Sequence, residues 1–258
     1  MKALILAGGL GTRLGEITES IPKPMVRLDS QPILWHLMKI LDSQGIDEID
    51  LLLGYKGEVI REYILKLPKI DLDFEIVLDG SNPQYLTNLD PIRLSSKLKI
   101  GTIDTGLESF TARRIKIGIE KSSNSEFLVT YGDGLADIDI SALYEFHLSH
   151  GRLATVTAVH PLARFGHLEI DTDRVVSFEE KNQVNEGWIN GGFMILNRGV
   201  IDYLGDDEPF EGNPMKKLAE DQELMAYRHD GFWHPMDTPS DVSILKKLSK
   251  LNVPPWLT

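Results

Sequence analysis

The sequence contains no cysteine, which excludes a disulfide framework, a thiolate nucleophile and any metal site built on sulfur. Positive charge is also scarce, because 27 Lys and Arg residues stand against 39 Asp and Glu residues and leave a net charge of -12. A chain of that sign is repelled by nucleic acid and by anionic membranes. We therefore expect no nucleic-acid partner and no membrane partner, and an anionic ligand must bind at a local basic site.

Long hydrophobic runs are missing as well. The first apolar run, from Ala3 to Ala7, ends at two glycines and is too short for the core of a signal peptide. No later run approaches the roughly 18 apolar residues of a membrane span. These absences predict a cytoplasmic protein. The hydrophobic share of 42% and the charged share of 26% are typical of a globular chain with a sizeable core.

Short runs rich in Leu, Ile and Val alternate with helical patterns over the first 160 residues, as they do in β-α-β units. Strands are predicted over residues 2–7, 49–53, 74–78, 99–103 and 126–131, and helices over residues 33–41, 59–67 and 111–121. Residues 79–100 have little periodicity and are predicted to form a loop or a small excursion.

Beyond residue 150 the predicted strands follow one another closely, which favours antiparallel pairing. They cover residues 153–159, 168–170, 175–180, 192–196 and 224–228. Thr238, Pro239 and Asp241 form the capping-box pattern of a last helix. No linker or repeat separates the halves. We predict one domain over residues 1–258, an α/β, Rossmann-like doubly wound fold with a mixed, mainly parallel sheet that gains antiparallel strands in its C-terminal half.

A glycine-rich loop directly follows the first predicted strand. Residues 6–13 read LAGGLGTR, in which glycines let backbone N–H groups approach an oxyanion and Arg13 adds a forked cation. The loop lacks the third glycine of a dinucleotide fingerprint and the Gly-Lys-Ser/Thr ending of a P-loop. We interpret it as a phosphate cradle of another kind, the alternative being an ordinary tight turn.

A lysine between two prolines is the next candidate. Pro22 and Pro24 stiffen the backbone on either side of Lys23, so that its ammonium is expected to project from an exposed loop. A lone surface lysine is the alternative. However, basic residues outnumber acidic ones over residues 1–27, which favours an anion-binding role in this otherwise acidic chain.

Two aspartates are predicted to share a divalent cation. Asp133 follows the apolar strand over residues 126–131, and ligands of open α/β sheets bind at the carboxyl ends of strands. Asp237, just before the last helix, is the candidate second carboxylate; its alternative role is to interact with that helix's dipole. Asp137 and Asp139 are predicted to be turn and cap residues.

Two further segments are candidates for binding a second phosphate and sugar hydroxyls. Glu180 and Lys181 end one predicted strand, and Asn190 and Gly191 begin another. Taken alone, each of these segments is more typical of the protein surface than of a site.

Together these segments resemble the sugar nucleotidyltransferases, also called nucleoside-diphosphate-sugar pyrophosphorylases, nearly from end to end. The likeness is closest to the branch of that family that acts on CTP and glucose 1-phosphate. It is carried by LAGGLGTRL at 6–14, PKPM at 22–25, PILWH at 32–36, GYKG at 54–57, TYGDG at 130–134, RFG at 164–166, INGGF at 189–193, GFWHPMDT at 231–238 and PW at 255–256.

The resemblance implies transfer of a nucleotidyl group from CTP to glucose 1-phosphate, with Mg²⁺ as cofactor, giving CDP-glucose and diphosphate in a homo-oligomeric enzyme. It implies nucleotide binding in residues 1–150, by Leu6, Ala7, Gly8, Gly9, Gly11, Thr12, Arg13, Lys23, Ser109, Arg114 and Gly132. It implies binding of the sugar phosphate in residues 151–258, by Glu180, Lys181, Asn190 and Gly191. Metal binding falls to Asp133 and Asp237, and catalysis to Arg13, Lys23 and Asp133.

The chain departs from the family pattern in two places. Asn182 stands where the family has proline after Glu-Lys, and Ala112 and Arg113 stand where it has two glycines. These changes bear on sugar placement and base recognition, so dTTP, UTP or another sugar 1-phosphate is the nearest alternative. A dinucleotide-dependent oxidoreductase and a non-catalytic nucleotide-sugar-binding regulator are the alternatives from other classes.

Overall fold

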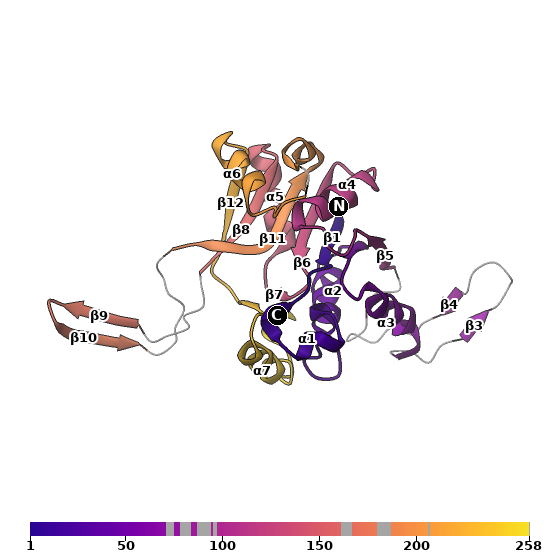
Figure 1. The fold of residues 1–258 in the computed structure, drawn as a ribbon, viewed down its shortest axis with the longest axis horizontal. Coiled ribbons are helices and arrows are strands. Elements are labelled where there is room, and N and C mark those ends of the chain that lie inside the picture. The colour runs from indigo at the N-terminus through magenta and orange to yellow at the C-terminus, as the bar shows by residue number, and fades with distance from the viewer. Residues whose placement is uncertain are drawn as a thin grey trace.

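The computed structural model describes residues 1–70, 75–77, 84–86, 94, 97–160, 167–179, 187–205 and 207–257. Within these ranges a central sheet has seven strands in the order β12-β8-β11-β6-β1-β2-β5 (Figure 1). Their bounds are β1 Lys2–Ala7, β2 Glu48–Leu53, β5 Lys99–Asp104, β6 Glu126–Tyr131, β8 Ala154–Val159, β11 Ile189–Asn197 and β12 Leu224–His229.

The central sheet is mixed and mainly parallel, as the sequence predicts. β1 pairs in parallel with both β2 and β6, β2 with β5, and β12 with β8, whereas β11 runs antiparallel between β6 and β8. Strands from both halves of the chain are therefore hydrogen-bonded in one sheet.

Helices cover both faces of this sheet. They are α1 Ile17–Ser20, α2 Ile33–Ser43, α3 Gly57–Ile70, α4 Thr111–Glu120, α5 Ile140–His150, α6 Asn213–Glu220 and α7 Pro239–Leu248, with short 3-10 turns η1 Thr12–Leu14, η2 Lys23–Met25, η3 Arg198–Tyr203 and η4 Pro255–Leu257. None of the helices in the described ranges has the length and apolar content needed to cross a membrane.

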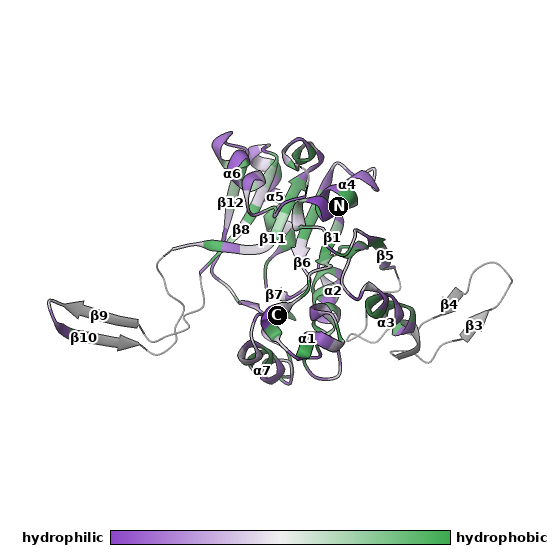
Figure 2. Cartoon of the chain, viewed as in Figure 1, coloured by the Kyte–Doolittle hydropathy of each residue, from purple (hydrophilic) through white to green (hydrophobic). Residues whose placement is uncertain are grey.

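The alternation of side chains along β1 separates two hydrophobic cores. Ala3, Ile5 and Ala7 face a core built with α2, α5 and α7, and Leu4 and Leu6 face a second core built with α4 and α6. Figure 2 shows hydrophobic residues concentrated in the central strands, with hydrophilic ones on the outer faces of the helices. Burial on both faces explains why the strand is apolar throughout.

In the part of the chain that the structure describes, three short pairs of strands lie outside the central sheet: β3 Glu75–Val77 with β4 Gln84–Leu86, β7 Gly134–Ala136 with β13 Trp233–Pro235, and β9 His167–Asp171 with β10 Arg174–Glu179. Where the structure describes the predicted strands over 168–170 and 175–180, they pair with each other and with no other described strand. Residues 74, 78 and 180, which end two predicted strands, lie outside the described residues.

Two local predictions for helix starts are confirmed. Thr238 accepts a hydrogen bond from the N–H of Asp241, and the Asp241 carboxylate accepts one in return, which completes the capping box of α7. Asp139 is the N-cap of α5 and accepts from the N–H of Ala142. Helices α5 and α6 themselves are not predicted from the sequence, because the apolar residues of α5 form no clear repeat and α6 is only 8 residues long.

The carboxyl ends of the parallel strands bring separate loops to one edge of the sheet. Leu6 of β1 lies opposite Tyr131 of β6, and Ala7 lies opposite Leu53 of β2. The N–H of Gly132 donates to the Leu6 carbonyl over 2.9 Å. The glycine-rich loop, the loop after β2 and the Gly132-Asp133 turn therefore open at the same edge.

Candidate active site

A cavity of 390 Å³ lies at this edge of the sheet, within the size range of small-molecule sites. It brings together every residue expected to bind nucleotide or metal, from segments far apart in the sequence. Its lining includes Leu6, Ala7, Gly8, Gly9, Gly11, Thr12, Arg13, Lys23, Ser109, Arg114, Gly132, Asp133 and Asp237, together with Pro24, Phe110, Thr111, Tyr131, Pro209 and Glu211.

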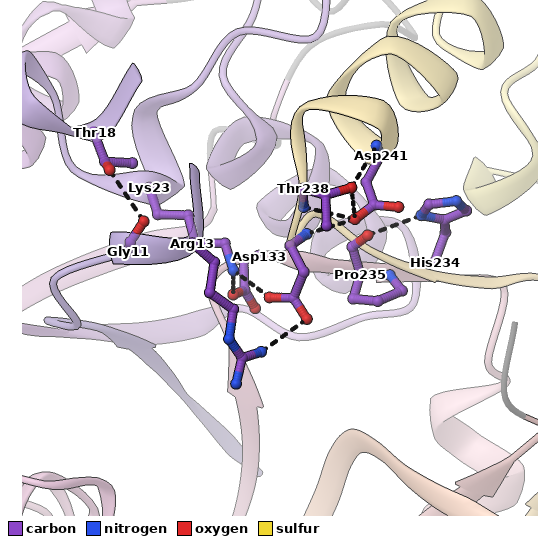
Figure 3. Close-up of polar contacts among 10 residues, drawn as sticks. Gly11, Arg13, Thr18, Lys23, Asp133, His234, Pro235, Thr238 and Asp241 are labelled. Atoms are coloured by element: carbon purple, nitrogen blue, oxygen red, sulfur yellow. Dashed lines mark hydrogen bonds and ion pairs between the residues drawn. The ribbon is translucent and has the colours of Figure 1, made fainter. Parts of the chain in front are cut away.

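The glycine-rich loop presents backbone donors to the cavity. Gly11 has a φ of 67°, the left-handed conformation that glycine adopts most readily, and it is the N-cap of the 3-10 turn η1. The Thr18 hydroxyl donates to the Gly11 carbonyl over 3.0 Å and fixes the loop (Figure 3). The N–H groups of Gly9 to Gly11 donate to no residue that the structure describes. They are therefore available to an anionic ligand.

Arg114 supports the glycine-rich loop through hydrogen bonds. Its side chain is buried, and its guanidinium donates to the carbonyl oxygens of Gly8, Leu53, Gly106 and Leu107 and to the Thr105 hydroxyl. These bonds tie together the loops that follow β1, β2 and β5. The expected nucleotide contact of Arg114 stays a prediction, but the N–H groups of its guanidinium already donate to oxygen atoms of the protein.

The close approach of Arg114 requires glycine at two positions. A Cβ atom added at Gly8 or at Gly54 would collide with the guanidinium of Arg114. The first glycine of the loop therefore has a packing reason as well as its expected role toward phosphate.

Lys23 lies between the two aspartates expected to bind metal. Its Nζ is 2.6 Å from Oδ2 of Asp133 and 2.7 Å from Oδ1 of Asp237. Only 9% of Lys23 is exposed, so the expectation of an exposed lysine is wrong. The flanking prolines fix the backbone, but long-range packing places the side chain between two carboxylates.

These ion pairs keep Lys23 charged. Burial lowers the pKa of Lys23, but the charges and hydrogen bonds of Asp133 and Asp237 together outweigh burial, so that the pKa is raised above its ordinary value. The result is a fixed positive charge at one end of the cavity. Arg13 adds a second cation there, with Nη1 3.2 Å from Oδ2 of Asp237 (Figure 3).

The position of Asp237 follows from the start of α7 and from β13. The N–H of Asp237 donates to the Asp241 carboxylate over 3.0 Å, so the capping box holds Asp237 as well. The N–H of Met236 donates to the Asp133 carbonyl over 2.8 Å, and Pro235 pairs with Gly134. The helix start and the short strand pair thus bring the second carboxylate beside the first.

Another wall of the cavity comes from the start of α4 and the loop before α6. The Thr111 hydroxyl donates to Glu211 over 2.9 Å and accepts from the N–H of Phe210 over 2.7 Å. The Tyr131 hydroxyl also donates to Glu211. Burial, followed by the charge of Glu211, raises the pKa of Tyr131 well above its ordinary value, which keeps this phenol neutral.

Six residues that line the cavity are missing from the sequence-based prediction. Phe110, Tyr131 and Glu211 line the cavity, and so do Pro24, Thr111 and Pro209. Pro24, Phe110 and Tyr131 stand directly beside the predicted site residues Lys23, Ser109 and Gly132, which is the one signal that could have found them. Glu211 belongs to no motif, because its place depends on contact between α4 and a distant loop.

The structure describes only two of the four residues expected to bind the sugar phosphate. Asn190 and Gly191 are the second and third residues of β11 and are not among the residues that line the cavity. The Gly191 carbonyl accepts from Nε1 of Trp233 over 2.7 Å, which ties this strand to the segment leading to Asp237. Glu180 and Lys181 lie outside the described residues.

Comparison with known proteins identifies the family. A family model described as nucleotidyl transferase matches residues 2–245. The chain is 44% identical to the glucose-1-phosphate cytidylyltransferase of Salmonella typhi, with 100% of this chain and 99% of the relative covered. It is 41% identical to the probable glucose-1-phosphate cytidylyltransferase of Bacillus subtilis, with 96% of each covered.

A solved structure agrees with these relatives. The crystal structure of HddC from Yersinia pseudotuberculosis superposes with a TM-score of 0.70 at 29% identity, over 96% of this chain and 99% of that chain. The resemblance expected from the motifs is confirmed over nearly the whole sequence. The chain therefore belongs to the nucleotidyl transferase family.

Proposed function

We propose that this enzyme transfers a cytidylyl group from CTP to glucose 1-phosphate, giving CDP-glucose and diphosphate. The observation that carries the reaction type is the convergence of Lys23 and Arg13 with Asp133 and Asp237 below a glycine-rich loop. The choice of CTP and glucose 1-phosphate is supported by the 44% identity to the Salmonella typhi enzyme over the whole chain.

The reaction is a direct displacement at phosphorus. An oxygen of the sugar phosphate attacks the α-phosphorus of CTP, and the new P–O bond forms as the bond to the β-phosphate oxygen breaks. The attacking oxygen is already anionic, so no general base is needed. The barrier comes mainly from bringing anions together in line.

The residues of the cavity have separate tasks in this scheme. The free N–H groups of Gly9 to Gly11 and the guanidinium of Arg13 hold the triphosphate. Lys23, which is charged and fixed in place, stabilises negative charge on the transferring phosphoryl group.

The two carboxylates suit Mg²⁺. Because both contact the same Nζ atom of Lys23 within 2.7 Å, Asp133 and Asp237 lie within reach of one cation. No group of three or more His, Asp or Glu residues that could hold a metal ion by itself occurs in the described ranges, and one or two carboxylates together with substrate phosphates are a common set of Mg²⁺ ligands. When bound, the ion offsets phosphate charge and orients the leaving group.

The sugar phosphate is assigned to the second half of the chain. Lys181 is proposed to contact its phosphate, and Glu180, Asn190 and Gly191 its hydroxyl groups, so that residues 1–150 bind nucleotide and residues 151–258 bind the sugar phosphate. A single-domain organisation, a cytoplasmic location and homo-oligomeric assembly also stay predictions.

The proposed reaction is tested by incubating the enzyme with CTP, glucose 1-phosphate and Mg²⁺ and measuring diphosphate release and CDP-glucose. We expect turnover that stops on addition of EDTA and returns with excess Mg²⁺. Binding of CDP-glucose without any turnover would instead support a nucleotide-sugar-binding regulator. Undiminished turnover in EDTA would contradict the metal site.

Lys181→Ala separates the two phosphate sites. Loss of one charge-assisted hydrogen bond is expected to lower kcat/KM for glucose 1-phosphate by about tenfold to a hundredfold and to leave the Kd of Mg²⁺-CTP close to that of the wild type. Steady-state kinetics and calorimetry measure the two quantities. Equal weakening of both substrates would mean that Lys181 has a shared or structural role.

A further inference from the structure

We propose that the ring of Phe110 stacks on the base of the bound nucleotide. This inference rests on the proposed function only in that the ligand is a nucleoside triphosphate. It adds to the site a residue that carries affinity for the base, on the wall formed by the start of α4 and the loop before α6.

Two chemically different groups of residues line the cavity. Lys23, Asp133 and Asp237 gather where the segment before α7 meets the end of β6, and their charges suit phosphates and metal. Ser109, Phe110 and the loop before α6 form the other wall, at the start of α4. We place the phosphates of a nucleotide at Lys23, Asp133 and Asp237, and its base on this second wall.

Phe110 is unusually exposed for an aromatic residue. Half of it, 52%, is accessible to solvent, although it lines the cavity. Burial of aromatic surface is a large favourable term. A planar base lying on the ring would cover this surface and add favourable stacking contacts that the free protein does not make.

The backbone of Phe110 is held firmly, so its exposure does not come from a poorly supported loop. Its N–H donates to Oδ1 of Asp207 over 2.7 Å, and its carbonyl accepts the first helical hydrogen bond of α4 from Arg114. The next residue, Thr111, is hydrogen-bonded to Glu211 and to Phe210. The ring therefore extends from a braced helix start.

Tyr131 is the other aromatic residue that lines the cavity, and it is less suited to stacking. Its hydroxyl donates to Glu211. Its ring lies against the backbone of Gly192, so closely that a Cβ atom there would collide with it. Of these two aromatic residues, Phe110 is therefore the one whose surface is exposed enough to stack on a base.

Stacking on the base would affect the affinity for a nucleotide but not the choice among bases. Every base has a π-face, so the contact raises affinity without selecting one base. The inference therefore concerns how tightly the nucleotide is held, and base selection must come from other groups.

The test is calorimetric titration of Mg²⁺-CTP into the enzyme without sugar phosphate, so that no turnover occurs. We expect Phe110→Ala to raise the Kd by about 5- to 150-fold. Phe110→Trp should bind CTP about as well as the wild type, because it keeps an aromatic face. Phe110→Leu should stay weakened, because it keeps an apolar side chain but no ring.

A matched control lies in the same loop. Leu107 is 58% exposed but is not among the residues that line the cavity, so Leu107→Ala should leave the Kd unchanged. Mg²⁺-tripolyphosphate, which has no base, should bind the wild type and Phe110→Ala equally. Thermal melts of both variants should match the wild type, since neither side chain is buried.

Wild-type affinity for CTP in Phe110→Ala, full recovery in Phe110→Leu, or equal loss of tripolyphosphate binding would each overturn the inference. Failure of the proposed function would look different. In that case the wild-type enzyme itself would not bind CTP, or would turn over a different nucleotide, whatever stands at position 110.

Discussion

Lys23→Met is expected to lower kcat by a factor on the order of 10² to 10³, the usual loss when one preorganised electrostatic stabiliser is removed. Methionine keeps most of the buried stem and removes only the charge. In the wild type that charge lies 2.6 Å from Asp133 and 2.7 Å from Asp237, beside the expected path of the transferring phosphoryl group. Single-turnover rates with saturating CTP measure the effect on the chemical step.

Lys23→Met is also expected to lower stability, because two carboxylates then face each other without their shared counter-ion. A control for this is Lys2→Met. Lys2 is a mostly buried lysine paired with Asp50 over 2.8 Å, and it does not line the cavity. Denaturant unfolding should show that both variants are destabilised, whereas only the Lys23 variant loses rate. A normal kcat in Lys23→Met would mean that this lysine has a structural role alone.

Asp133→Asn is expected to reduce kcat/KM by about 10³-fold or more, since it removes one of the two carboxylates proposed to hold Mg²⁺, and a catalytic metal supplies several kcal/mol of charge stabilisation. Asparagine keeps the size of the side chain but halves the negative charge of the pair. The Mg²⁺ concentration needed for half-maximal activity should rise as well. Kinetics over a range of Mg²⁺ concentrations give both quantities.

Asp139→Asn is the matched control for this change. Asp139 lies in the same segment but caps α5, and asparagine caps helices about as well as aspartate. We expect its activity and Mg²⁺ dependence to equal those of the wild type. If Asp133→Asn kept the wild-type dependence on Mg²⁺, the metal would have to bind elsewhere.

Much of the fold and of the charged end of the site could be predicted because their causes are local. The apolar run of β1 reflects burial on both faces of a parallel sheet, and the loops after β1 and β6 share an edge because parallel strands end together. Asp237 could be found because Thr238 and Asp241 mark the start of α7, and the residue before a helix start has a fixed place.

The remaining features depend on packing between distant segments. Nothing beside Lys23 in the sequence indicates that two aspartates enclose it, and its burial reverses the expectation from its proline-flanked loop. Phe110 and Glu211 meet at the cavity only because the loop before α6 folds over the start of α4. Contacts of this kind leave no local pattern, so a single sequence does not reveal them.

The most direct measurement is diphosphate release with CTP, UTP, dTTP, ATP and GTP, each combined with a panel of sugar 1-phosphates. We expect CTP with glucose 1-phosphate to give the highest kcat/KM. A higher value for UTP or dTTP with glucose 1-phosphate would contradict the cytidylyl assignment, and a higher value for another sugar would contradict the assignment of glucose. Absence of diphosphate release from every pair would contradict nucleotidyl transfer itself.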